Sequence, residues 1–333
     1  MEMRSVAGSE VKVTKVIFGA WAVGGWMWGG NDHQKSIEAI RASIDAGVTS
    51  IDTAPVYGQG LSEQIVGEAI RGLPRSEIQI LTKCGLRWDA EVGEFFFDSE
   101  GADGGTVRTY RYAGHDSVLA ECEASLRRLG TDYIDLYQLH WPDPTTPIAE
   151  TMDAFATLVN QGKVRAIGVS NFSADQMHEA DQSVSIVSNQ VPYSMVNRGI
   201  ESELVPYCIE HGKGILAYSP LQRGLLTGKF APGHVFASGD HRADNEFFSG
   251  ENIRRVNEFL DAIRPIADGH RATVSQLAIA WAVSQPGITA ALVGARDALQ
   301  ARANAVGGHI RLSDAEQTEI RSRLAELRLE GLK

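Results

Sequence analysis

The sequence predicts an α/β protein whose chain closes into a (β/α)8 barrel, the TIM-barrel fold. Eight short apolar segments alternate with longer helical patterns, and the 333 residues exceed the roughly 250 that such a barrel requires. No G-x-G-x-x-G motif follows the first expected strand, which counts against the doubly wound open sheet that alternating elements also permit. We therefore expect a single barrel domain over residues 1–333.

Each expected strand is a short run rich in β-branched and aliphatic residues, as parallel strands buried on both faces require. In chain order the eight runs are Lys15–Gly19, Ser50–Thr53, Ile78–Lys83, Tyr133–His140, Val164–Val169, Ile186–Gln190, Gly214–Tyr218 and Ile288–Val293.

The segments between these runs show helical periodicity. In Ser117–Arg128, for example, apolar residues recur every three or four positions and form one face. Several helices end at a glycine, a residue common just past a helix. Examples of the expected helices are His33–Ala46, Glu63–Arg71, Ser117–Arg128, Ile148–Asn160 and Ser202–His211. Two more are expected between Asn252 and Pro286, a further one beginning near Asp297, and an extra C-terminal helix over Ser313–Leu329.

Two connections are unusually long, Cys84–Gly114 and Pro220–Gly250. Both follow a strand, so in a barrel they rise on the C-terminal face, where active sites are built. The first carries several aromatic residues, which favours burial or substrate contact over disorder.

Composition narrows the functional classes. The net charge of −11 argues against nucleic-acid binding, which requires a basic face. Three cysteines without CxxC spacing fit a reducing compartment and not a disulfide framework or metal site. The first residues lack an apolar signal-peptide core, and the apolar stretch before residue 30 is too short for a membrane span. We expect a cytoplasmic protein without membrane contact and without a metal.

Four reactive side chains fall at or just beyond expected strand ends: Asp52, Tyr57, Lys83 and His140. Any one of them alone has an ordinary explanation, as a helix cap, a solvated lysine or a core histidine. Neighbouring barrel strands deliver their C-terminal ends to one pocket, however, so four such residues together predict an active site.

With these residues in place, the sequence resembles the aldo-keto reductase family, in particular its bacterial NADP-dependent type. The resemblance extends from about residue 11 to residue 310. It rests on DTAPVYGQGLSEQIVGEAI, ILTK, YIDLYQLHWPD, KVRAIGVSNF, SNQVPYSMVNR, AYSPLQRGLLTGKF and ALVGAR. It implies an oxidoreductase that interconverts small-molecule carbonyls and alcohols by hydride transfer, with Asp52, Tyr57, Lys83 and His140 as the catalytic tetrad.

The chemistry suits these residue types. Reducing a carbonyl by hydride requires a proton at the oxygen as negative charge develops there. A free tyrosine has a pKa of about 10, and we expect Lys83, paired with Asp52, to lower the pKa of Tyr57. His140 then orients and polarises the carbonyl as a hydrogen-bond donor, and Tyr57 acts as the base in the reverse reaction.

The resemblance also implies a set of cofactor contacts. Ser170, Asn171 and Gln190 correspond to residues that hold the nicotinamide carboxamide, Tyr218 to the ring stacked on the nicotinamide, and Arg296 to a residue near the adenosine 2′-phosphate. The full set is Gly19, Ala20, Trp21, Asp52, Ser170, Asn171, Gln190, Tyr218, Ser219, Leu221, Arg223, Gly224, Gly294, Ala295, Arg296, Gln300 and Asn304.

Two departures from the family pattern affect cofactor and substrate. Ala303 stands before Asn304, where many members carry an acidic residue, so NADP(H) is expected as the cofactor with NAD(H) as the alternative. The stretch after Lys83 is much extended, so substrate preference does not carry over. Trp21, Trp88 and Trp141 are candidates for the substrate pocket beside Tyr57 and His140. Cys84 should point away from that pocket as a buried, inert thiol.

Two other functions remain open on the sequence. A barrel lyase could use Lys83 as a Schiff-base nucleophile, although this leaves Tyr57 and the GVSNF segment without a role. A redox-sensing regulatory subunit with slow turnover could share the same fold and tetrad.

Overall fold

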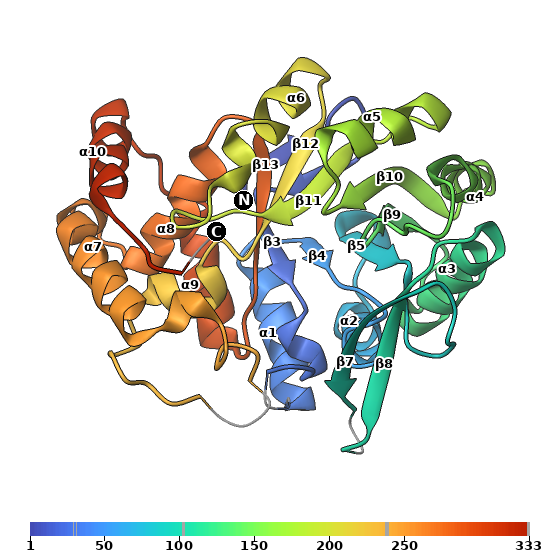
Figure 1. Ribbon diagram of the computed structural model, residues 1–333, viewed down its shortest axis with the longest axis horizontal. Helices are drawn as coiled ribbons and strands as arrows, with labels where there is room; N and C mark the ends of the chain where they lie inside the picture. Colours follow the sequence, from blue (N-terminus) through green and yellow to red (C-terminus); the bar gives the residue numbers. More distant parts are fainter. Residues whose placement is uncertain (29, 31, 102–103, 237–239, 332–333) are drawn as a thin grey trace.

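The structure, a computed structural model, describes residues 1–28, 30, 32–101, 104–236 and 240–331. Its centre is a closed barrel of eight parallel strands ringed by helices (Figure 1), which confirms the predicted fold class. Every expected strand corresponds to a barrel strand within three residues at either end. The barrel strands are β3 (Val16–Gly19), β4 (Ser50–Asp52), β5 (Gln79–Cys84), β9 (Ile134–Leu139), β10 (Val164–Ser170), β11 (Ser188–Pro192), β12 (Gly214–Tyr218) and β13 (Ile288–Val293).

The helices follow the barrel strands as expected, and α7 and α10 pack against each other outside α8 (Figure 1). Their N-termini show why they begin where they do: Ser173, Thr273 and Ser313 each form a capping box with the residue three positions later. The helices are α1 (His33–Asp45), α2 (Leu61–Ile70), α3 (His115–Leu129), α4 (Ile148–Asn160), α5 (Ala174–Ser183), α6 (Leu204–Glu210), α7 (Gly250–Gly269), α8 (Val274–Ser284), α9 (Ala298–Gly307) and α10 (Asp314–Glu326).

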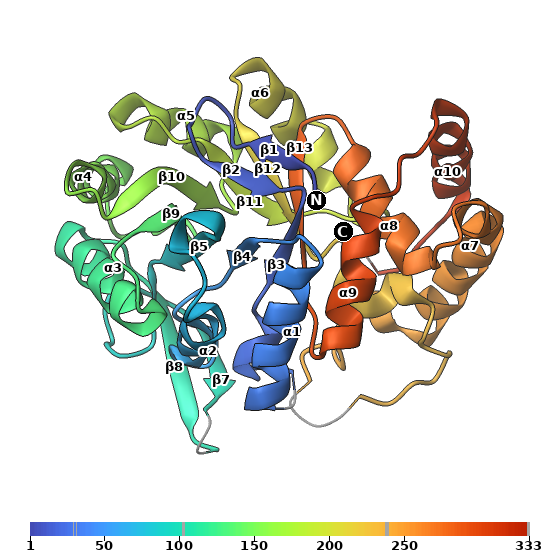
Figure 2. The ribbon, with the colours of Figure 1, turned by 180° about the vertical axis from the view of Figure 1, so that it is seen from behind.

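An N-terminal hairpin that was not predicted closes one end of the barrel. It consists of β1 (Met3–Ser5) and β2 (Lys12–Thr14), seen from behind in Figure 2. Its valines pack in one cluster with inward-facing barrel residues such as Ile17, Leu81 and Leu136. Three-residue strands carry too little periodicity to stand out in the sequence.

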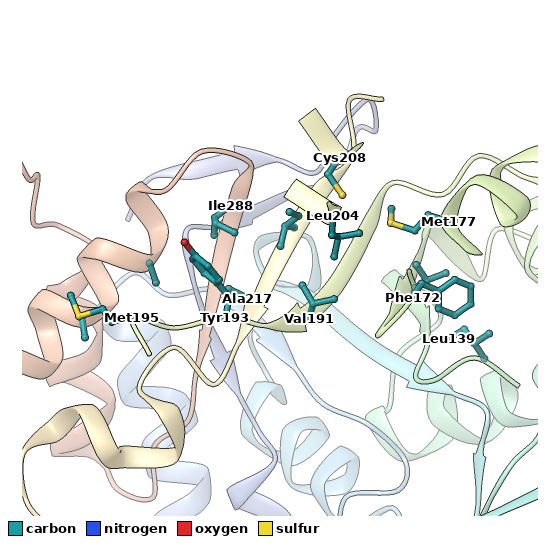
Figure 3. Packing of buried hydrophobic residues seen from close by; sticks show 14 of the residues in the cluster. Leu139, Phe172, Met177, Val191, Tyr193, Met195, Leu204, Cys208, Ala217 and Ile288 are labelled. Atoms are coloured by element: carbon teal, nitrogen blue, oxygen red, sulfur yellow. The ribbon is translucent and has the colours of Figure 1, made fainter. Parts of the chain in front are cut away.

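Because side chains alternate along a strand, residues two positions beyond this apolar layer also point inward. They are polar: Lys83 lies two residues after Leu81, and Gln138 two residues after Leu136. Residues of the other parity pack between the barrel and its helices. Figure 3 shows Val191 and Ala217 of the barrel beside Leu204 and Cys208 of α6.

The long connection after β5, whose conformation the sequence left open, is not a plain loop. It holds a three-stranded antiparallel sheet of β6 (Leu86–Arg87), β8 (Thr106–Arg111) and β7 (Glu94–Glu100). The aromatic and β-branched residues of β7 and β8 favour strands. Residues 102–103 of this connection, and residues 237–239 of the connection after β12, lie outside the described residues.

The second long connection, Pro220–Gly250, contains two short 3-10 helices. They are η4 (Gln222–Thr227), which directly follows β12, and η5 (Glu246–Phe248), which leads into α7. The remaining 3-10 turns are η1 (Ala22–Gly24), η2 (Arg75–Glu77) and η3 (Gly199–Glu201).

A buried carboxyl group fastens the base of the inserted sheet to the barrel. Glu121 of α3 accepts hydrogen bonds from the Gly85 N–H at 3.0 Å and from the Ser117 hydroxyl at 3.1 Å. Arg87 of β6 donates to the same Ser117 hydroxyl. Burial raises the pKa of Glu121 to about 7, against the opposing effects of the Gly85 hydrogen bond and the Arg87 charge. Glu121 therefore holds the segment that directly follows Lys83 and Cys84.

This raised pKa predicts how stability depends on pH. The folded protein binds the Glu121 proton more tightly than the unfolded chain, so the resulting stabilisation is present below about pH 4.5 and lost as pH rises toward 7. Glu121→Gln does not titrate, so its unfolding free energy relative to wild type should rise over that range, by up to roughly 3 kcal/mol.

Urea unfolding at pH 5 and pH 8 measures this difference. Glu123→Gln, at a more exposed position on the same helix, serves as the control and should show no comparable pH trend. A Glu121→Gln difference that is the same at both pH values would contradict the assignment.

Candidate active site

A buried ion pair lies inside the barrel at the carboxyl ends of its strands. Lys83 Nζ donates to Asp52 Oδ1 at 2.6 Å and to the Thr53 carbonyl at 2.9 Å. Lys83 is 0% and Asp52 2% exposed, so both charges lie away from water. A lone buried charge would be very costly, and each group therefore depends on the other.

Tyr57 and His140 stand beside this pair. Lys83 Nζ lies 5.3 Å from the centre of the Tyr57 ring, and the Tyr57 and His140 rings meet edge to face at 5.7 Å. Tyr57 is held in a turn after β4, where its N–H donates to the Ala54 carbonyl. His140 follows the last residue of β9, and its N–H donates to the Cys84 carbonyl. The structure thus brings together all four predicted tetrad residues.

The expectation that Lys83 brings the pKa of Tyr57 below its ordinary value was wrong. Burial raises the pKa of Tyr57 well above 10, and the negative charges of Asp52 and of ionised Tyr218 add to this effect. The physical reason is that the loss of water around a buried phenolate, together with the nearby negative charge of Asp52, outweighs the attraction of Lys83. Burial and the Lys83 charge also lower the pKa of His140 well below 6.5. At neutral pH both Tyr57 and His140 are therefore uncharged hydrogen-bond donors.

Cys84 behaves as expected. Its side chain belongs to the cluster between the barrel and the helices, and its Sγ lies 3.7 Å from the Gln138 carbonyl. Burial raises the pKa of this thiol well above 9. It does not point into the site.

The residues expected to hold the nicotinamide carboxamide lie at the ends of β10 and β11, next to the tetrad. Asn171 donates to the His140 carbonyl at 3.1 Å and accepts from the Tyr218 hydroxyl at 3.0 Å. Ser170 donates to the Gln190 carbonyl. The Gln190 amide nitrogen contacts Asp52 Oδ2 at 2.8 Å. These side chains form one connected network with the ion pair.

Gly19, Ala20 and Gly294 lie at the carboxyl ends of adjacent strands. Gly19 pairs with Asp52 in the barrel register, and the Ala20 N–H donates to the Asp52 carbonyl at 2.8 Å. A methyl group at Gly294 would approach the Gly19 carbonyl at 3.3 Å. The two glycines thus allow the ends of β3 and β13 to approach each other closely at this corner.

The segment after β12 has an unusual backbone. Ser219, Gln222 and Arg223 adopt positive φ angles of 55°, 46° and 54°, and Gly224 adopts 96°. Such angles are costly for residues other than glycine and concentrate at functional sites. Leu221, in the same segment, packs against two of the core clusters. The segment that was expected to cover the pyrophosphate is thus the most strained described stretch near the site.

Two basic residues that sequence reasoning missed extend this region. Lys229 Nζ would lie 3.7 Å from a Cβ at Gly224, and the charges of Arg242 and Arg296 act on it. The Arg242 guanidinium contacts Asp240 and lies 5.0 Å from the Trp28 ring. Over the described ranges, no carboxylate forms an ion pair with Arg223, Lys229 or Arg296. The TGKF segment that carries Lys229 was noted only as part of the family pattern.

At the far end of this region, a cavity of about 440 Å³ lies between α1 and α9. Its lining includes Asp32, Lys35, Arg296 and Asp297, two carboxylates and two cations. Asp297 is the N-cap of α9 and accepts the Gln300 N–H at 2.8 Å. The helix N-terminus that was expected to attract a phosphate therefore already faces a carboxylate.

The other three residues expected in this segment are also engaged locally. Asn304 donates to the Gly294 carbonyl at 3.0 Å, and Gln300 donates to Asp297. Ala295 is buried among apolar residues of α1 and α9.

Aromatic side chains cover the other side of Tyr57. Trp88 and Trp141, both predicted pocket residues, pack with Tyr57 in one cluster that also includes Trp26 and Phe96. Trp21 lies 6.2 Å from Tyr57, ring centre to ring centre. Trp26 and Phe96 were missed, although the glycine-rich WAVGGWMWGG stretch and the aromatic run of β7 carry the signal.

A larger cavity of about 740 Å³ lies on the opposite face, beside the N-terminal ends of β5 and β9. It is lined by residues such as Arg71, Arg75 and Tyr133 and contains no tetrad residue. We place the active site by the convergence of reactive side chains and not by cavity size.

Two properties complete the description. Among the described residues, no cluster of three or more His, Cys, Asp or Glu is arranged to hold a metal ion. None of the helices in those ranges is long and apolar enough to cross a membrane.

A parallel barrel with a buried Asp–Lys pair beside an uncharged tyrosine and histidine at its carboxyl ends defines an oxidoreductase acting on carbonyl and alcohol groups. Comparison with known proteins agrees. The model of the aldo/keto reductase family matches residues 15–325, and the chain belongs to that family.

Curated relatives are similar over most of their length. The aldo-keto reductase YhdN of Bacillus subtilis is 40% identical over 89% of this chain and 85% of its own. The NADH-specific methylglyoxal reductase of Escherichia coli is 37% identical over 94% of this chain and 95% of its own.

Solved structures show the same fold. A glycerol dehydrogenase from Gluconobacter oxydans is 35% identical, covers 99% of this chain and 97% of its own, and has a TM-score of 0.88. An aldo-keto reductase from Klebsiella pneumoniae in complex with NADPH is 28% identical, covers both chains fully and has a TM-score of 0.73.

These findings do not favour the two alternative functions. A Schiff-base lyase needs a neutral lysine that substrate can reach, whereas Lys83 is fully buried and paired with Asp52. The relatives reported above bear the names of reductases and a dehydrogenase, which does not favour a purely regulatory subunit.

Proposed function

We propose that this protein reduces the carbonyl group of small aldehydes and ketones, with Tyr57 as the proton donor and NADPH as the preferred cofactor. One observation carries the proposal: Tyr57 and His140 converge beside the buried Asp52–Lys83 pair, and both are uncharged at neutral pH. The reduced nicotinamide supplies the hydride when it is bound. We place the protein in the cytoplasm, where its three buried free thiols remain reduced.

Each residue has a distinct part in the proton transfer. His140 donates a hydrogen bond that orients and polarises the substrate carbonyl. Tyr57 holds its proton until negative charge develops on the carbonyl oxygen and then transfers it there. The Lys83 ammonium stabilises the phenolate that remains, and Asp52 keeps Lys83 charged in a site where burial lowers the lysine's pKa.

The residues of the β12 segment fit a dinucleotide. Arg223 and Lys229 have no carboxylate partner among the described residues, and burial lowers the pKa of both. An anion next to them would relieve this cost, and a pyrophosphate is such an anion. Tyr218, at the end of β12, is half-buried with its hydroxyl on Asn171, so a face of its ring can stack on a nicotinamide.

The preference for NADPH over NADH rests on a balance of charge. Arg296 and Lys35 can attract a 2′-phosphate, while Asp297 and Asp32 oppose it. The Klebsiella pneumoniae structure holds NADPH, whereas the Escherichia coli relative is NADH-specific. We propose that NADPH binds more tightly and that NADH is also accepted.

The aromatic side of the pocket suggests the substrate class. The indole N–H groups of Trp21, Trp26 and Trp28 are buried and find no acceptor among the described residues. Donors of this kind suit a small substrate with more than one oxygen, because an unpaired buried donor is costly. The names of two relatives, a methylglyoxal reductase and a glycerol dehydrogenase, fit such substrates. Short 2-oxoaldehydes and hydroxyketones are therefore the first compounds to test.

Tyr57→Phe should lose most carbonyl reduction while its cofactor affinity stays close to wild type. The hydroxyl acts mainly in the transition state, so kcat should fall by roughly 10²–10⁴-fold and the Kd for NADPH should change little. Absorbance of the reduced nicotinamide gives kcat, and quenching of tryptophan fluorescence gives Kd. A variant that keeps more than about a tenth of wild-type kcat would remove Tyr57 from the mechanism.

The two reaction directions should respond differently to pH. Alcohol oxidation needs the Tyr57 phenolate, which the raised pKa makes scarce at neutral pH, so its rate should climb through the alkaline range. Reduction uses the protonated form and should not climb. Initial rates in both directions with the same alcohol–carbonyl pair test this. Parallel pH profiles in the two directions would refute the assignment of Tyr57 as the titrating acid.

Arg296→Ala should weaken NADPH binding by roughly 1–3 kcal/mol, the range for hydrogen bonds to charged groups. NADH binding should be nearly unchanged because NADH lacks the 2′-phosphate, and the NADPH penalty should shrink as salt is raised. Fluorescence titration with both cofactors measures these effects. Equal weakening of both would mean that Arg296 supports the adenine or the fold instead.

Asp297→Asn is the matched variant of opposite sign. Asparagine keeps the N-cap hydrogen bond to Gln300 but removes the negative charge. NADPH should therefore bind more tightly to it than to wild type, with NADH affinity little changed.

A further inference from the structure

A glutamine outside the predicted tetrad lies at the centre of the buried network. Gln138, on β9, is 0% exposed. Its Nε2 donates to Asp52 Oδ2 at 3.2 Å, and its Oε1 accepts from Gln190 Nε2, also at 3.2 Å. The carboxylate can only accept hydrogen bonds, which fixes the orientation of both glutamine amides.

Asp52 is thereby held from three directions. Lys83 binds its Oδ1 from β5, while Gln138 and Gln190 bind its Oδ2 from β9 and β11. Because Gln190 Nε2 is shared between Asp52 and Gln138, the three side chains form a closed ring. Moving any one of them changes the hydrogen bonds of the other two.

The barrel makes room for this glutamine. Gly168 of β10 pairs with Gln138 on one side and with Ser188 on the other. A Cβ at Gly168 would lie 3.1 Å from Gln138 Cγ and 2.8 Å from Ser188 Oγ. The Gln138 side chain thus occupies space that any larger residue at position 168 would contest.

We propose that Gln138 is a positioning residue of the reductase: it fixes the Asp52–Lys83 pair and links it, through Gln190, to the nicotinamide end of the cofactor site. Gln190 has its amide nitrogen on Asp52 and Gln138, which leaves its amide oxygen for the cofactor carboxamide. Binding of the carboxamide to Gln190 then affects the hydrogen bonds that position Asp52. A change in the position of Asp52 in turn affects Lys83 and Tyr57. The inference rests on the proposed function for the role of Gln190.

Without Gln138, Asp52 Oδ2 keeps a single donor, and Gln190 loses one of its two acceptors. Asp52 is then less firmly positioned against Lys83, and because burial opposes the lysine's charge and Asp52 is its main support, a displaced Asp52 leaves the Lys83 ammonium less stabilised. The titratable or charged groups near Lys83 are Asp52, Glu63 of α2, Tyr57 and His140. Of these groups, only Asp52 is hydrogen-bonded to both Lys83 and Gln138.

The test uses Gln138→Met, which keeps the length of the side chain but removes its polar atoms, together with Gln190→Met and the double variant. For Gln138→Met, kcat should fall about tenfold or more, the loss expected for a hydrogen bond to a charged group. KM for the carbonyl should stay within about twofold, since the residue does not touch substrate. The alkaline limb of the kcat–pH profile should move to lower pH, because Lys83 loses its proton more readily.

The double variant isolates the link to the cofactor site. If the two glutamines act as one unit, the combined loss in cofactor affinity should be clearly smaller than the product of the single losses. Fluorescence titration of NADPH measures this without turnover, so it reports on the link even if the proposed reaction fails. Wild-type turnover of carbonyl compounds reports separately on the proposed function.

Gln138→Glu guards against a folding artefact. A protonated glutamic acid can still donate to Asp52, whereas its ionised form repels it, so this variant should be most active at low pH and lose activity as pH rises. Circular dichroism and thermal melting confirm folding of every variant. The proposal is overturned if folded Gln138→Met keeps wild-type kcat and pH profile, or if the single losses in cofactor affinity simply multiply.

Discussion

The ion pair between Asp52 and Lys83 is the interaction on which the rest of the site depends. Two opposite charges inside a barrel are stable only where each finds its partner and further hydrogen bonds. Lys83 gains Asp52 and the Thr53 carbonyl, and Asp52 gains two glutamine amides in addition. Burial, reinforced by the charges of this pair, leaves Tyr57 and His140 uncharged at neutral pH, which suits them to donate a proton and a hydrogen bond.

The barrel separates the two tasks that its interior must perform. At one end, Leu81 and Leu136 form an apolar layer that the N-terminal hairpin closes, and this layer supplies stability. Two residues further along the same strands, Lys83 and Gln138 form the start of a polar layer. Since side chains alternate along each strand, a residue two positions away faces the same interior. The catalytic layer therefore rests directly on a packed base, and its side chains have little freedom to move.

The sequence predicted the barrel and the tetrad because both depend on local signals. Eight apolar runs that alternate with helical patterns mark the strands, and DTAPVYG and ILTK place Asp52, Tyr57 and Lys83 at or just beyond strand ends. It did not predict the raised pKa of Tyr57, because that shift comes first from the burial of the side chain, which only the folded barrel and its aromatic cover produce. Nor did it predict Gln138, since an isolated glutamine in a strand carries no signal until three strands bring its partners together. The sheet after β5 was missed because its strands resemble an aromatic-rich loop.

Charge is distributed along the site in a way that matches the parts of a dinucleotide and its substrate. Around Tyr57 the side chains are aromatic or uncharged, apart from Asp52 and Lys83, which carry opposite charges and form an ion pair. Further along, Arg223 and Lys229 are cations without carboxylate partners among the described residues. At the end between α1 and α9, cations and carboxylates balance. On the proposed function, we infer that cofactor affinity comes chiefly from the middle of this path, where a pyrophosphate would lie. We propose that discrimination between the two nicotinamide cofactors depends on the small charge difference at its end, which a single substitution at Arg296 or Asp297 should shift in either direction.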